Sequence, residues 1–81
     1  MGFRNAQTPS GSEVVVAGSG PVDYVGLEVI TASDLVYVDS QGNTTTLTAG
    51  AGTGPVPAGM SILCRIVKVT TASGAVLGLK P

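Results

Sequence analysis

Pro57–Thr71, with the sequence PAGMSILCRIVKVTT, is the most informative stretch of the chain for its fold. It opens with a Pro-Ala-Gly turn and continues as a run of aliphatic and β-branched residues without a helix cap or helical spacing. Side chains alternate between the two faces of a strand, and here both faces are largely apolar. This pattern predicts a central strand that is covered on both sides or that bends at a bulge. The two faces are Ile62, Cys64 and Ile66 on one side, and Leu63, Arg65, Val67 and Val69 on the other.

The rest of the chain also consists of short extended segments separated by turn-forming residues. Leu35–Asp39 and Thr44–Thr48 flank a short loop with Gly and Asn, which predicts a β-hairpin. Gly26 lies inside another extended segment and predicts a bulge or a close backbone approach. About six strands at this spacing predict an all-β fold, a small single-domain antiparallel β-barrel or sandwich. The remaining predicted strands are Glu13–Ala17, Val22–Thr31 and Ala75–Leu79.

Residues 1–12 carry turn formers without periodicity, which predicts a flexible N-terminal arm before a β-domain over residues 13–81. Phe3, the only phenylalanine, lies in this arm beside Arg4. Aromatic side chains dominate interface energetics, so Phe3 either anchors the arm in a neighbouring subunit or folds back onto its own domain. In the first case, Phe3 and Arg4 are contacts with another protein.

Size and charge favour self-association. A domain of 81 residues has a marginal core, which small domains often supplement with disulfides, a metal or oligomerisation. Cys64 is the only cysteine, so no internal disulfide can form, and the chain has no histidine, the commonest zinc ligand. Charged residues make up 11 % of the chain, and Lys68 and Lys80 are the only lysines available to protect strand edges. We therefore expect a homo-oligomer, with a soluble monomer as the alternative. Arg65 and Lys68 are then either ion-pair partners for a neighbouring subunit or rim residues whose stems cover the sheet.

Other classes of function find little support. A net charge of −1 without a basic patch argues against nucleic acid, and no apolar run is long enough for a membrane span. Cys64 has no histidine to activate it, and Gly50–Gly54 is followed by a strand rather than by the helix of a phosphate-binding loop. We therefore predict no enzyme, metal or cofactor. The carboxylates are scattered: Glu13, Asp23, Glu28, Asp34 and Asp39.

The C-terminal half carries a recognisable order of elements. A short strand is followed by a polar hairpin, a Thr-rich strand, a Val-Pro-Ala-Gly turn, a long strand dotted with Arg and Lys, and a Thr/Ala/Gly turn before a short apolar end. In this order, residues 34–79 resemble the head spike base proteins of gene transfer agents and related tailed phages. The corresponding segments are Leu35–Val38, Asp39–Asn43, Thr44–Thr48, Val56–Gly59, Ile62–Val69 and Thr70–Leu79.

The resemblance implies a virion structural protein without catalytic residues. Its implied role is a collar on the exterior of a capsid vertex, assembled in the host cytoplasm, that holds a spike or fibre. The implied partners are further copies of the chain (a pentamer, with a trimer as the alternative), the major capsid protein, and the spike or fibre. A head decoration protein and a tail-fibre base are variants of this class, and a free carbohydrate-binding β-module is the alternative from another class. Gly50–Gly54 departs from the tighter link of the family.

Overall fold

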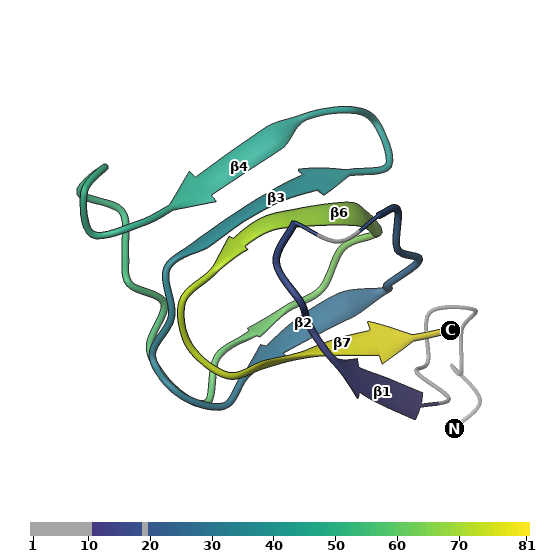
Figure 1. Ribbon diagram of the computed structural model, residues 1–81, viewed down its shortest axis with the longest axis horizontal. Helices are drawn as coiled ribbons and strands as arrows, with labels where there is room; N and C mark the ends of the chain where they lie inside the picture. The colour runs from purple at the N-terminus through teal and green to yellow at the C-terminus, as the bar shows by residue number, and fades with distance from the viewer. Residues whose placement is uncertain (1–10, 19) are drawn as a thin grey trace, which may run out of the picture.

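The computed structural model describes residues 11–18 and 20–81, which form seven strands and no helix (Figure 1). The predicted all-β class is therefore confirmed. All neighbouring strands are antiparallel, and they form a four-stranded sheet in the order β1-β7-β2-β5 and a three-stranded sheet in the order β4-β3-β6. The strands are β1 (Gly11–Val14), β2 (Gly26–Val29), β3 (Leu35–Asp39), β4 (Thr44–Leu47), β5 (Ser61–Ile62), β6 (Ile66–Ala72) and β7 (Val76–Lys80).

The two sheets are joined at two seams but do not close into a barrel. At one seam, Tyr24 and Ile66 exchange backbone hydrogen bonds of 3.1 and 2.9 Å. At the other, Ser33 and Val56 exchange bonds of 3.0 and 2.8 Å. The strands at the ends of each sheet order, among them β1 and β4, do not pair with one another. The arrangement is therefore closer to a sandwich than to a barrel.

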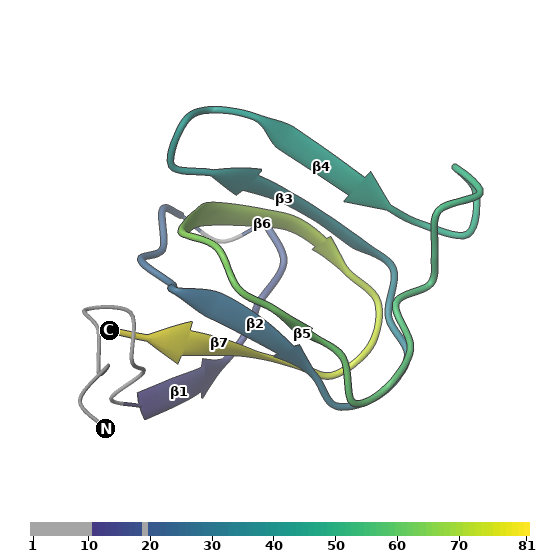
Figure 2. The same ribbon diagram turned by 180° about the vertical axis from the view of Figure 1, so that it is seen from behind.

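The stretch Pro57–Thr71 is not one strand, so the predicted single central strand is wrong. Its first part, β5, pairs with β2, as Figure 2 shows, whereas its second part, β6, pairs with β3 in the other sheet. Residues 63–65 carry the chain across between the sheets. Both faces of the run are apolar because its two halves contribute to two different sheets. The predicted bend is a change of sheet, and the predicted bulge is also present, because the pairing of β6 with β3 shifts register between Ile66 and Lys68 and again between Val69 and Thr71.

The hairpin and the close approach at Gly26 are confirmed. β3 and β4 pair from Leu35 opposite Leu47 to Val38 opposite Thr44. A Cβ atom at Gly26 would lie 2.8 Å from the carbonyl oxygen of Ile62, so only glycine fits between β2 and β5 without displacement.

The predicted N-terminal arm lies outside the described residues except for its last two. Gly11 and Ser12 belong to β1, where they pair with Lys80 and Leu79 of β7. The β-domain therefore begins at least two residues before the predicted boundary at residue 13.

The loop between β4 and β5 closes on itself before it reaches the second seam. The carbonyl oxygen of Thr48 accepts hydrogen bonds from the backbone N–H groups of Ala51, Thr53 and Gly54, at 3.2, 3.1 and 2.9 Å. The hydroxyl of Thr53 also donates to the carbonyl of Thr46 at 2.8 Å. The loop, seen at the left of Figure 1, thus satisfies much of its own backbone and projects from the sandwich.

The core lies between the sheets and is built from the inward side chains of both. Leu27, Leu35 and Ile66 are completely buried. The ring of Tyr24 lies directly over Gly78 in the middle of β7, so that a Cβ atom at Gly78 would overlap the ring. Glycine is disfavoured in strands, and its presence here follows from this ring contact. The other core residues are Val29, Tyr37, Val56, Val69 and Val76.

The ring contact predicts a large effect of a single methyl group. We expect Gly78→Ala to lower the free energy of unfolding by about 1–3 kcal/mol, because the Tyr24 ring must move away from β7. Gly50→Ala is the matched control, since a Cβ atom there meets nothing within 4 Å. Urea titration of both variants measures the difference. Equal stability of the two variants would show that Tyr24 does not pack on Gly78 as described.

Candidate functional site

Two mainly apolar surfaces stand out among the described residues, one on the outer side of each sheet. In residues 11–18 and 20–81, no three side chains of His, Cys, Asp or Glu gather as a metal site would require. The same residues include no helix with the length and hydropathy of a membrane span.

Of the four contact residues predicted from the sequence, Phe3 and Arg4 lie outside the described residues, and Arg65 and Lys68 lie within them. Arg65 binds within its own chain: its Nε and a terminal guanidinium nitrogen donate to Oδ1 of Asp23, at 2.9 and 2.8 Å. Both side chains are about half exposed or more, so the pair adds little to stability. Arg65 is therefore already paired before any neighbouring subunit binds.

Lys68 lines an open, mainly apolar groove on the outer side of the three-stranded sheet. It lies on β6 opposite Val38 of β3, and its exposed side chain has no ion pair within the described residues. The groove has a volume of about 270 Å³. We call this feature the Lys68 groove, and it is lined by Gly20, Pro21, Val38, Val67 and Lys68.

The outer side of the four-stranded sheet carries a second apolar surface. Strand register places one row of side chains across it, from Val14 through Leu77 and Glu28 to Ser61. The next row includes Leu79 opposite Gly26, and the side chain of Leu63 extends over the same glycine. Val14 and Leu63 are 68 % and 74 % exposed, and Leu77 and Leu79 are half-buried. We call this surface the leucine face, and its members are Val14, Leu63, Leu77 and Leu79 around Glu28.

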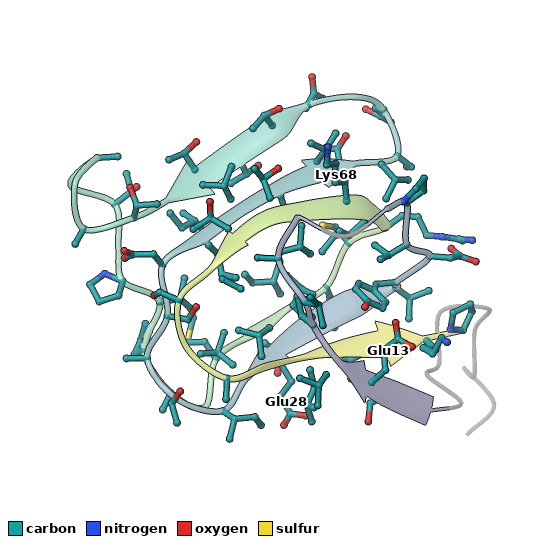
Figure 3. The ribbon with its side chains drawn as sticks, viewed as in Figure 1. Glu13, Glu28 and Lys68 are labelled. Carbon is teal, nitrogen blue, oxygen red and sulfur yellow. The ribbon has the colours of Figure 1, made fainter. Side chains whose placement is uncertain are left out.

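Glu28 is the only charged residue in these rows, and it has no ion pair or hydrogen bond within the described part of the chain. Its neighbours across the strands are Leu77 of β7 and Ser61 of β5. Figure 3 shows Glu28 beside β2 and β7 and Lys68 beside β3 and β6, at opposite sides of the molecule.

Sequence reasoning did not single out the leucine face, although a signal for it exists. β7 reads Val-Leu-Gly-Leu-Lys, and only its alternate residues, Val76 and Gly78, are buried. Leu77 and Leu79 must then point outward, because successive side chains in a strand face opposite sides. A strand with glycine on its inner side and leucines on its outer side therefore predicts apolar side chains on the outer face of its sheet.

A small polar network holds β1 against β7 on the inner side of the four-stranded sheet. The hydroxyl of Tyr24 donates to Oε2 of Glu13 at 2.8 Å, and Nζ of Lys80 lies 3.0 Å from Oε1 of the same carboxylate. The Tyr24 and Lys80 hydrogen bonds lower the pKa of Glu13. Burial, together with the hydrogen bond to Glu13, raises the pKa of Tyr24 to about 12. This network anchors the edge strand that begins the described domain.

Cys64 lies in the crossing between β5 and β6 rather than in a strand, but it is half-buried and packs against the core, as predicted for a small hydrophobic residue. Burial, with a smaller contribution from Asp39, raises the pKa of its thiol. Because the thiolate is the reactive form, Cys64 is a weaker nucleophile at neutral pH than an ordinary cysteine.

The Tyr24 pKa predicts a loss of stability in alkali. Tyrosine ionises near pH 10.0 in the unfolded chain and near pH 12 in the folded protein, so the folded state holds this proton more tightly. The contribution of this proton to the free energy of unfolding is complete below pH 10. It is lost as the pH rises toward 12, by up to about 1.4 kcal/mol per pH unit. We expect Tyr24→Phe to reduce this slope, measured by denaturant unfolding at several pH values. An identical slope in both proteins would contradict the assignment to Tyr24.

The chain matches no family model, no curated protein and no solved structure.

Proposed function

We propose that this chain is a structural protein of a phage-like particle. In this role it forms a homo-oligomeric collar on the outside of a capsid vertex and attaches a head spike or fibre there. The observation that carries the proposal is the leucine face, which leaves Val14 and Leu63 mostly exposed around a single charge. Contiguous apolar surfaces of this kind mark sites of protein association. The resemblance of residues 34–79 to head spike base proteins is the reason why we propose a collar on a capsid vertex rather than another kind of assembly.

The sheet edges also favour an assembly. β4 lies at the edge of its sheet and consists of three threonines and a leucine, with no charge or proline to discourage another strand from pairing. β1 lies at the edge of the other sheet. In a ring of copies, neighbours would cover such edges and add stability that a small core lacks. A pentamer fits a capsid vertex, and a trimer would fit a decoration protein or a fibre base.

The alternative from another class, a free carbohydrate-binding module, is less well supported. Sugar sites present an aromatic platform beside convergent polar groups. Tyr24 and Tyr37, the only aromatic residues in the described part, are both buried. The large hydrophobic residues exposed there include no aromatic ring; they are Val14, Val16, Ile30, Met60, Leu63 and Val67.

The proposal is tested on particles rather than on the isolated protein. Tailed particles released by cells that encode the chain are purified, and gold-labelled antibodies against the chain are located on them by electron microscopy. We expect label on the heads, concentrated at vertices, and a copy number per particle that is a multiple of five. Label on the tail would favour the fibre-base variant, and particles without the protein would contradict a virion role.

A second test concerns the N-terminal arm, where Phe3 and Arg4 are the proposed contacts with the major capsid protein. We expect a chain that begins at Gly11 to keep its fold and its self-association, because β1 is intact, but to be lost from particles. Phe3→Ala should reduce incorporation in the same direction, whereas Gln7→Ala serves as the control. Incorporation is measured by quantitative mass spectrometry of purified particles. Unchanged incorporation of both altered chains would remove the arm from the interface.

A further inference from the structure

We infer that copies of this chain join head to tail, with the leucine face of one copy on the Lys68 groove of the next. Glu28 and Lys68 then form an ion pair across the contact. This inference rests on the self-association in the proposed function, and it adds the two surfaces that would carry it.

Ion pairing and hydrogen bonding among the described residues leave two opposite charges without partners. Every other charged side chain of the described residues has an ion pair or accepts a backbone hydrogen bond. Among residues 11–18 and 20–81, only Glu28 and Lys68 have neither. The satisfied groups are Glu13 with Lys80, Asp23 with Arg65, Asp34 with the N–H of Ala49, and Asp39 with the N–H groups of Gln41 and Asn43.

Glu28 and Lys68 both lie among apolar side chains. Glu28 lies among the aliphatic side chains of the leucine face. Lys68 lies in a groove whose other side chains are Pro21, Val38 and Val67. When two apolar surfaces close on each other, any charge that they trap must find a partner, because an unpaired buried charge is strongly unfavourable. Each surface carries one charge, and the two charges have opposite signs.

The same charges disfavour the symmetric alternatives. Two leucine faces packed together would bring Glu28 toward Glu28, and two Lys68 grooves would bring Lys68 toward Lys68. Like charges in an interface reduce affinity, so the unlike pairing is preferred. The leucine face belongs to the β1-β7-β2-β5 sheet and the groove to the β4-β3-β6 sheet, on opposite sides of the sandwich (Figure 3). Each copy therefore has one surface of each kind, and repeated contacts form a closed ring or a filament.

Charge-reversal variants test the contact, because a second reversal should restore the assembly that the first one abolishes. Glu28→Lys places a lysine against Lys68, and Lys68→Glu places a glutamate against Glu28, so each single variant should dissociate. We expect the dissociation constant between copies to rise by about tenfold or more in each. The double variant restores an opposite pair and should assemble like the natural chain. Native mass spectrometry over a range of concentrations measures all four proteins.

Mixing the single variants gives an independent signature. The lysine that replaces Glu28 in one variant then meets the glutamate that replaces Lys68 in the other. At the next contact, the unchanged Glu28 of the second variant meets the unchanged Lys68 of the first. We therefore expect the mixture to assemble with the two variants in alternation, so that any closed ring holds an even number of chains, although neither variant assembles alone. A symmetric interface of two leucine faces would not respond to Lys68→Glu at all.

The control places the same charges where no contact is expected. Ala51 is exposed in the self-closed loop at the end of the molecule. Ala51→Lys and Ala51→Glu should leave assembly unchanged, and circular dichroism confirms that every variant is folded.

The outcomes separate the inference from the proposed function. If the natural chain assembles and the single reversals assemble equally well, the head-to-tail contact is overturned while self-association stands. If the natural chain remains a monomer at every concentration, both the contact and self-association in solution are overturned. The virion role is decided by the particle labelling. The contact is established if both single variants lose assembly and if assembly recovers in the double variant and in the mixture.

Discussion

The packing of the Tyr24 ring on Gly78 holds together three parts of the sandwich. The backbone of Tyr24 bonds to Ile66 at the seam between the sheets, and its ring covers β7 in the middle of the four-stranded sheet. Its hydroxyl then reaches Glu13 on the edge strand β1. One residue thus links the seam, the sheet centre and the sheet edge. The absence of a side chain at Gly78 is what allows the ring to lie so close to the strand.

The same contact explains why one side of the four-stranded sheet is a core and the other is an open surface. With the ring on the inner side of β7, the strand alternation directs Leu77 and Leu79 outward. No second layer in the described residues covers them. The leucine face therefore follows from the way in which the core is packed.

The parts of the fold that local sequence determines were predictable, and those that depend on long-range partners were not. The hairpin follows from Leu35–Asp39, Thr44–Leu47 and a turn whose Asp39 carboxylate accepts two backbone hydrogen bonds. Gly26 signalled a close approach because a missing side chain is visible in sequence. The crossing at residues 63–65 was not visible, because β-branched runs look the same within one sheet and between two. Likewise, Arg65 and Lys68 were both identifiable as charges in an apolar run, but only the fold shows that Asp23 neutralises Arg65.

The self-closed loop from Thr48 to Gly54 is suited to carrying an inserted peptide. Its two ends are held together by the Thr48 carbonyl, while Gly50 and Gly52 face open space. Lengthening a loop whose ends are already fixed costs little, about 0.6 kcal/mol for each doubling of its length. A short peptide inserted between Gly50 and Ala51 would project from the end of the molecule at the left of Figure 1, away from Glu28 and Lys68 as Figure 3 places them. The loop from Thr48 to Gly54 is therefore suited to presenting an epitope or an affinity tag without disturbing the packing of the sandwich.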